Sequence, residues 1–394
     1  MVGAASTAAL GAAEPDEECY RQGLRSAAQG SADEAIAWFD KLIAQFPASR
    51  RAPEAMLKLG ESYRDKKLYY LAVQQFNAVV DRYPEHSARA QLGVATCYSA
   101  QKKYLQAITL LQQAISALPD QDVREQMDYL LAQCYRGRKD WDTAIPMYQK
   151  LEAEHPEDAA QLRYGLGLCY LEKTDYEKAA RTFEDVAGAF PNTPTANEAL
   201  LKVAECFWEQ GKSAEDLAYL NKLYDEHPDL RARVLHRRAE VLTYCFSRHQ
   251  DALSDLRRIL TEYPADPIAV RARALTCDIV LNGLKDVPRG KALLREFFAS
   301  YPNYERTIVL RGRLADCAYA EGNYLEAARL FEDAYLYPEV SNWRPYFLFI
   351  IVDCYNRAGD APKAAAARGK LLMFYADDPW AQLLAGMHSD SSGR

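Results

Sequence analysis

The strongest constraint on the fold is a set of prolines that recurs along the whole chain at nearly constant spacing. Ten of the 18 prolines lie 35 to 41 residues apart, at Pro47, Pro84, Pro119, Pro156, Pro191, Pro228, Pro264, Pro302, Pro338 and Pro379. Proline cannot continue a helix, and it disfavours helical backbone in the residue before it. A period of this length predicts a repeated helical hairpin that must stack on its neighbours to bury an apolar face.

Small and aromatic residues recur at fixed positions inside each period. The clearest unit has Leu59-Gly60, Tyr63, Ala72 and Phe76 before its closing proline, and Leu166-Gly167, Tyr170, Ala179 and Phe183 repeat it. Small side chains let the two helices of a hairpin approach closely, and we expect the aromatic side chains to fill the space between hairpins. The aromatic position is held by Phe39, Phe76, Tyr148, Phe183 and Phe331.

This order of residues, L-G-x-x-Y…A-x-x-x-F…P, resembles the tetratricopeptide repeat. The resemblance covers about residues 16–380. It implies an all-α, right-handed superhelical solenoid of about ten hairpins, with a concave groove that is lined by the first helix of each hairpin and binds extended or helical peptides. Phrases such as Phe46-Pro-Ala-Ser-Arg-Arg-Ala-Pro-Glu-Ala55 further resemble bacterial envelope members, of the outer-membrane assembly and Tol–Pal coordinator type.

The repeats divide the chain into four segments. Residues 1–15 are Ala-rich and predict either a disordered terminus or the remnant of an export signal. Repeats one to six occupy 16–228, the more divergent repeats seven to ten occupy 229–380, and 381–394 is expected to be a flexible tail. Two units depart from the pattern, because Asp216 stands where a small Ala belongs and Asn282–Gly290 is an enlarged turn.

Charge is distributed unevenly along the chain. The net charge is −7, yet residues 229–315 hold 16 Lys and Arg against 10 Asp and Glu. Such asymmetry bears on partners rather than on the fold. The basic patch that we expect there consists of Arg231, Arg233, Arg237, Arg238, Arg257, Arg258, Arg271 and Arg273.

Six cysteines share one repeat position, at Cys97, Cys134, Cys169, Cys206, Cys317 and Cys354. Equivalent positions in stacked hairpins are about 8–10 Å apart, which is too far for disulfides. We therefore expect these thiols to be packing residues, with a redox or metal-responsive array as the alternative. Free thiols favour a reducing compartment, which conflicts with an envelope setting. No catalytic or metal-binding motif is found in the sequence, so we expect neither an enzyme nor a cofactor.

Projection of the first helices onto their inner face selects the candidate groove. The residues expected to contact a partner are Arg64, Tyr129, Arg136, Tyr164, Trp208, His236 and Tyr244, because aromatic and Arg side chains dominate interface energetics. The expected function is a non-catalytic scaffold that binds peptide or helical segments of other proteins in a bacterial envelope complex, periplasmic or envelope-associated. The alternative is a cytoplasmic regulator that contacts nucleic acid or an acidic partner through residues 229–315.

Overall fold

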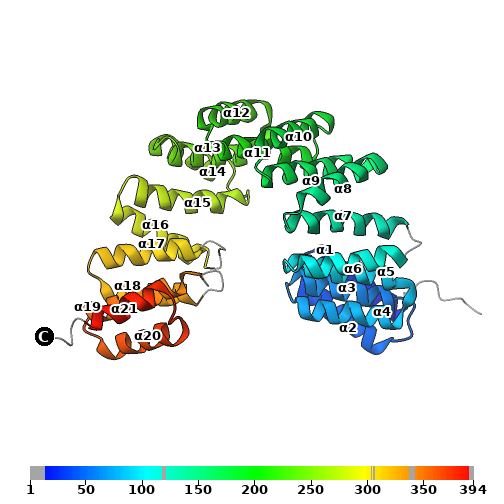
Figure 1. Cartoon of the computed structure of the whole chain (residues 1–394), viewed down its shortest axis with the longest axis horizontal. Coiled ribbons are helices and arrows are strands. Elements are labelled where there is room, and N and C mark those ends of the chain that lie inside the picture. The colour runs from blue at the N-terminus through cyan, green and yellow to red at the C-terminus, as the bar shows by residue number, and fades with distance from the viewer. Residues whose placement is uncertain (1–13, 118–120, 303, 305–306, 337–341, 390–394) are drawn as a thin grey trace, which may run out of the picture. The chain divides into compact units, whose positions relative to one another are not determined.

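The computed structural model describes residues 14–302 except 118–120, and then 304, 307–336 and 342–389. Within these residues the secondary structure is entirely helical (Figure 1). The terminus predicted at 1–15 lies outside the described residues apart from its last two, as do Pro119 and Pro338. Two compact units divide the chain: unit 1 ends at Gln210 and unit 2 begins at Gly211.

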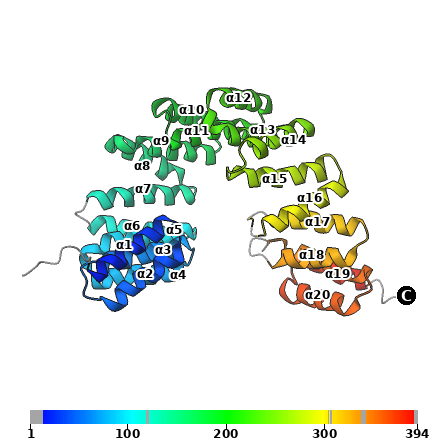
Figure 2. The same ribbon diagram turned by 180° about the vertical axis from the view of Figure 1, so that it is seen from behind.

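Unit 1 contains eleven α-helices among its described residues. They are α1 (Pro15–Ala28), α2 (Ala32–Gln45), α3 (Ala52–Asp65), α4 (Tyr69–Arg82), α5 (Ser87–Ala100), α6 (Tyr104–Ala117), α7 (Gln121–Gly137), α8 (Trp141–Glu154), α9 (Ala159–Glu172), α10 (Tyr176–Ala189) and α11 (Pro194–Glu209), with short 3₁₀ turns η1 (Pro84–His86) and η2 (Pro156–Asp158). Consecutive helices from α1 to α11 pack against each other, so the hairpins stack in chain order. The same order is visible from behind (Figure 2).

Unit 2 continues the pattern. Its helices are α12 (Ser213–Glu226), α13 (Arg231–Tyr244), α14 (His249–Glu262), α15 (Ile268–Asp278), α16 (Val287–Ser300), α17 (Thr307–Ala320), α18 (Tyr324–Tyr335), α19 (Arg344–Arg357), α20 (Ala361–Phe374) and α21 (Pro379–Ser389), with η3 (Pro228–Leu230) and a π-helical turn η4 (Ile279–Gly283). The predicted all-α repeat fold is confirmed, because each of the ten predicted repeats corresponds to one pair of helices. None of the described helices is both long and apolar enough to cross a membrane.

One residue in the turn of every repeat has left-handed backbone. These residues are Gly30, Lys67, Lys102, Lys139, Thr174, Gly211, Ser247, Lys285, Gly322 and Gly359, and they recur every 35 to 38 residues. In the second repeat the Lys67 N–H donates to the Arg64 carbonyl and the Leu68 N–H donates to the Tyr63 carbonyl, both at 2.8 Å. This pair of bonds closes the first helix and reverses the chain, as in a Schellman motif.

The small and aromatic positions meet as the sequence predicts. A Cβ at Gly60 would stand 2.7 Å from the Phe76 ring, and a Cβ at Gly93 would stand 2.6 Å from the same ring. Phe76 is 1% exposed, so its ring fills the space between α3 and α5. Three second helices are capped by a side chain, because Asp140, Asp175 and Asp360 each accept the backbone N–H three residues later.

The two predicted departures from the repeat pattern take different forms in the structure. Asp216 is fully buried in α12, at the position that Ala fills in neighbouring repeats. The enlarged turn begins as η4, a π-helical turn that includes Asn282, and α16 starts at Val287.

The structure corrects the expectation of a flexible tail from residue 381. Residues up to Ser389 belong to α21, and Ala381 and Leu384 are buried. The helix is held because the Trp380 ring lies 5.1 Å from the rings of both Tyr346 and Phe349 on α19. The apolar α19 is thus covered by α21 within unit 2.

Candidate functional site

The first helices of the hairpins in unit 1 form one continuous face. α3 contacts α1 and α5, α5 contacts α7, α7 contacts α9, and α9 contacts α11. Equivalent residues of successive repeats therefore lie side by side on this face, which is the geometry that a groove requires.

A cavity of about 670 Å³ lies along this face over α3, α5 and α7. Each of these helices contributes the same four repeat positions to it: Glu54, Leu57, Lys58 and Glu61; Arg89, Leu92, Gly93 and Thr96; and Gln126, Tyr129, Leu130 and Gln133. Arg64, Tyr20, Phe76 and Val123 complete the lining. Since the lining repeats from helix to helix, we call this surface the periodic groove.

A second cavity of about 390 Å³ adjoins the periodic groove. It shares Gln126 and Tyr129 with the first cavity, and its other lining residues are Glu125, Leu151, His155, Asp158, Gln161 and Leu162. Gln161 is the α9 counterpart of Gln126, so the second cavity extends the groove by one repeat.

Charged side chains of both signs line the groove. Lys58 Nζ lies 2.7 Å from the Glu61 carboxylate, and the Glu54 carboxylate lies 2.9 Å from the Arg51 guanidinium. Burial, reinforced by the neighbouring Glu54, raises the pKa of Tyr20 to about 12. Arg89 is exposed, so its guanidinium is accessible at the centre of the groove.

The structure brings two of the predicted contact residues, Arg64 and Tyr129, to one cavity. The Tyr129 ring lies 6.1 Å from the Tyr148 ring, and the Tyr164 ring lies 5.4 Å from the Phe183 ring. Tyr129 and Tyr164 are half-buried. Both tyrosines therefore pack against the second helix of their own hairpin and remain partly exposed.

The other predicted contact residues lie elsewhere. In unit 1, Trp208 is half-buried on α11, and the buried Arg136 Nε lies 3.9 Å from the Glu172 carboxylate. In unit 2, His236 is only 5% exposed and lies inside the packing of α13, so its ring is not on the surface. Tyr244 is 57% exposed, and its hydroxyl is 3.3 Å from Asp278 Oδ2.

Several arginines of the predicted basic patch are engaged by other side chains of unit 2. The guanidinium groups of Arg231, Arg238 and Arg258 all lie 5.0 to 5.5 Å from the centre of the Tyr224 ring. Arg238 also donates two hydrogen bonds to Asp255, at 2.7 and 2.6 Å. These contacts fix the side chains against the surface of unit 2.

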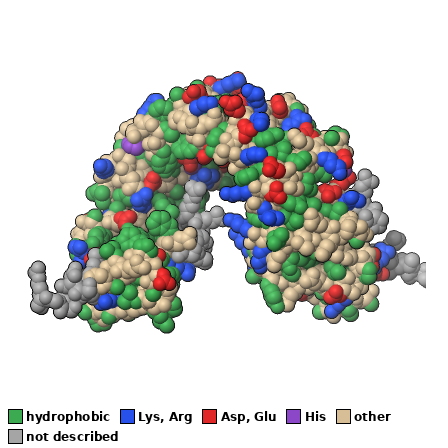
Figure 3. Space-filling model, in the orientation of Figure 1, with side chains coloured by type: hydrophobic (Ala, Val, Ile, Leu, Met, Phe, Trp, Pro, Cys, Tyr) green, Lys and Arg blue, Asp and Glu red, His purple; other side chains and the backbone are tan. Residues whose placement is uncertain are grey.

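The remaining arginines of the patch differ from one another in pairing and in exposure. Arg237 pairs with Glu240 at 3.3 Å, Arg233 is half-buried, and Arg257, Arg271 and Arg273 are exposed. Basic and acidic side chains are interspersed over the helices at the top of the space-filling view, α12 to α14 among them (Figure 3). This surface therefore carries charges of both signs rather than a uniformly positive patch.

The six thiols of the shared repeat position are all free and buried. Burial raises the pKa of Cys97 to about 11, and it raises the pKa of Cys169, Cys206 and Cys354 to about 12. A thiol that stays protonated is a poor nucleophile and a poor metal ligand. The environment of these cysteines is that of packing residues.

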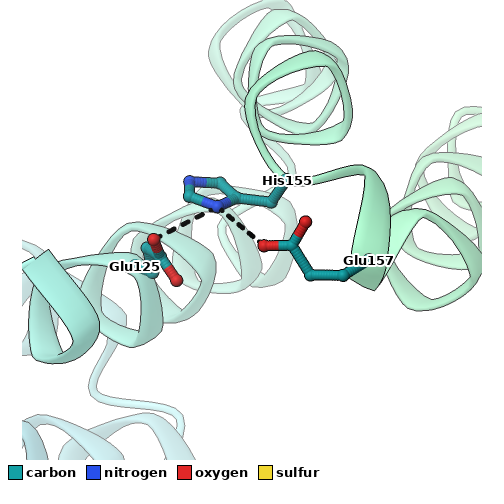
Figure 4. A group of neighbouring side chains, drawn as sticks. All are labelled: Glu125, His155 and Glu157. Carbon is teal, nitrogen blue, oxygen red and sulfur yellow. Dashed lines mark ion pairs between the residues drawn. The ribbon is translucent and has the colours of Figure 1, made fainter.

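Sequence reasoning missed part of the site. It selected Tyr129 but not Leu92, the α5 counterpart of Tyr129, although a shift by one repeat gives that position. It also did not select His155. In the structure His155 lies between Glu125 and Glu157, a group that no spacing along the chain indicates (Figure 4).

Comparisons with known proteins agree with the repeat. Family models described as tetratricopeptide repeat match residues 51–120, 129–194 and 170–230. No curated protein sequence matches the chain.

Solved structures resemble the chain at low identity. A tetratricopeptide repeat protein from Parabacteroides merdae ATCC 43184 is 16% identical, with a TM-score of 0.48, over 66% of this chain and 98% of that chain. Yeast Tom70 is 12% identical, with a TM-score of 0.45, over 96% and 88% of the two chains. PilW, a type IV pilus biogenesis factor, is 17% identical, with a TM-score of 0.45, over 58% and 98%. These similarities are too distant to bear on function. The family matches identify tetratricopeptide repeats within residues 51–120 and 129–230, and the described residues on either side form helical hairpins of similar length.

Proposed function

We propose that the chain is a non-catalytic scaffold that binds a segment of another protein along the periodic groove of unit 1. The repeat family supports a role in protein–protein interaction. The observation that carries the proposal is the cavity over α3, α5 and α7, where three helices present equivalent side chains in a row.

The spacing of the groove indicates what kind of segment fits. Leu57, Leu92 and Tyr129 hold the same position in successive repeats, so their helices are about 8–10 Å apart. An extended chain advances about 3.3 Å per residue, and a helix about 1.5 Å. The segment that fits therefore has apolar side chains at about every third residue if it is extended, or about every sixth or seventh residue if it is helical.

The charged residues of the groove add a requirement. Glu54 and Glu61 are each paired with a basic neighbour, and Arg64 is paired with Asp65 at 3.0 Å. Arg89 is an exposed basic side chain beside the apolar row. We therefore propose that the bound segment carries an acidic side chain beside its apolar anchors. A rim charge of this kind acts mainly on the association rate and on partner choice.

Site-specific crosslinking tests the location of the groove. A photoreactive amino acid at Leu92 is expected to capture one discrete protein in the source cells. The same amino acid at Tyr70, which is 74% exposed on the second helix of the hairpin, is the matched control. Equal capture from both positions, or none from Leu92, would contradict the groove as the binding surface.

For the setting of the protein, we propose a bacterial envelope complex, periplasmic or envelope-associated, on the resemblance of the sequence alone. A cytoplasmic location is the alternative. Fractionation of the source cells, with N-terminal sequencing of the mature chain, tests this. Recovery of the uncut chain in the cytoplasm would rule out the envelope setting.

The basic segment supports a second candidate, contact with an acidic partner through the exposed Arg257, Arg271 and Arg273. Binding that neutralises phosphates weakens steeply as salt rises. Titration with bulk RNA and DNA at two salt concentrations shows whether the acidic partner is a nucleic acid or a protein. No binding to either polymer would remove nucleic acid as the partner.

A further inference from the structure

Three side chains with metal-binding atoms converge where α7 meets the turn after α8. Glu125 belongs to the first turns of α7, His155 is the C-cap that directly follows α8, and Glu157 lies in η2 (Figure 4). His155 Nδ1 lies 3.2 Å from Glu125 Oε1 and 3.5 Å from Glu157 Oε1. Within the described residues this is the one group of three such side chains whose ligand atoms all lie within 4.8 Å of one another.

These separations match the edges of a tetrahedral metal site. Zinc binds His nitrogen and carboxylate oxygen at about 2.0–2.2 Å, so two ligand atoms at a tetrahedral angle stand about 3.3–3.6 Å apart. The two nitrogen–oxygen distances therefore need only small adjustments. The contact between Glu125 and His155 joins residues 30 positions apart, so helix packing sets it, whereas the local turn holds Glu157 beside His155.

We infer that Glu125, His155 and Glu157 form a binding site for a divalent transition metal of the zinc type. An imidazole nitrogen with carboxylate oxygens suits zinc and its neighbours, whereas magnesium and calcium prefer oxygen ligands alone. Three protein ligands leave a fourth tetrahedral position. Glu125 and His155 also line the second cavity, so a water or a ligand side chain reaches that position from the groove.

The site goes beyond the proposed scaffold function and does not depend on it. His227 is the matched control, because it too precedes a closing proline and is followed by an acidic residue, Asp229. The repeat counterpart of Glu125 in that unit is Asn197, so the third ligand is missing from the sequence there.

Calorimetric titration of the full chain with zinc chloride tests the assignment, after treatment with a chelator and dialysis. The protein used for the titration carries Cys245→Ser, because that exposed thiol would offer a competing zinc ligand. One zinc ion per chain is expected. Glu157→Gln and His155→Asn are each expected to weaken binding by at least about tenfold, while His227→Asn leaves it unchanged.

Two results would overturn the site. One is a parent chain that takes up no zinc, and the other is uptake that His155→Asn and Glu157→Gln leave unaltered. The Glu157 side chain is 66% exposed, so Glu157→Gln is expected to fold. If His155→Asn does not fold, Glu157→Gln decides the test. Magnesium in place of zinc is expected to give no binding. If magnesium bound as tightly as zinc and His155→Asn retained this binding, the imidazole would be excluded as a ligand.

Discussion

The carboxylate of Asp216 lies 4.0 Å from the guanidinium of Arg237, in the interior of unit 2. Asp216 is fully buried, and neither of its oxygens accepts a hydrogen bond from a described residue. Burial raises the pKa of Asp216 to about 6, although Arg237 acts in the opposite direction. A charged group here is therefore costly, at a repeat position that holds Ala in the two neighbouring repeats.

Asp216→Ala is predicted to stabilise the protein at neutral pH. The pKa of Asp216 is higher in the folded chain than the usual value near 4 in the unfolded chain, so the folded state binds more protons between about pH 4 and pH 6. The contribution of Asp216 to the free energy of unfolding is therefore present at low pH and is lost as the pH rises through about 6. We expect the variant to gain about 2 kcal/mol at pH 7.5 and less at pH 5, measured by urea unfolding. A variant less stable than the parent at pH 7.5 would contradict the assignment.

Gly93→Ala is predicted to destabilise unit 1, because the new methyl group would stand 2.6 Å from the buried Phe76 ring. Overpacking of this kind costs about 1–3 kcal/mol. Gly188→Ala in α10 is the control, since a Cβ there meets nothing within 4 Å and Ala favours the helix. Thermal unfolding should separate the two variants, and equal melting temperatures would show that the ring moves aside freely.

Thr174→Gly is predicted to stabilise the fifth repeat. Thr174 has φ = 64°, a conformation that is strained for a β-branched residue and open to glycine. The expected gain is about 1 kcal/mol. Gly30→Ala, at the equivalent turn with φ = 76°, should lose a similar amount. Chemical unfolding of both variants checks this, and a loss of stability in Thr174→Gly would mean that the threonine side chain makes compensating contacts.

Thiol labelling is predicted to find one fast cysteine among those described. Cys245 is exposed, whereas the other eight are buried. Burial raises the pKa of Cys277 to about 12, so this thiol stays protonated near neutral pH even when reagent reaches it. Cys245→Ser should abolish fast labelling with a disulfide reagent, and denaturant should release the rest. Rapid labelling of several thiols in the folded variant would support a redox or metal-responsive array of cysteines instead.

The repeat could be predicted from the sequence because each period carries the same physical signals. Pro84 and Pro191 end hairpins, and Gly60 and Gly167 lie beside large rings, so a single frame predicts all helix pairs. The final helix was missed because it has no further closing proline after Pro379. It is held by contacts of Trp380 with α19, which no local pattern reveals.

The candidate site was predictable only in part. Projection along one helix identifies Arg64, since this residue lies on the inner face of α3. The burial of His236 depends on how α13 packs, and the meeting of Glu125 with His155 depends on how α7 and η2 are placed. Such contacts join residues about 30 positions apart and are set by packing rather than by periodicity.

The most direct test of the periodic groove is the affinity of the chain for the protein that is captured at Leu92. Tyr129→Ala removes an aromatic anchor at the junction of both cavities and is expected to weaken binding at least about tenfold. Tyr70→Ala removes the same side chain from an exposed position on α4, and it is expected to leave the dissociation constant unchanged. Calorimetry on the purified pair measures both. Equal dissociation constants for the parent and Tyr129→Ala would contradict binding in this groove.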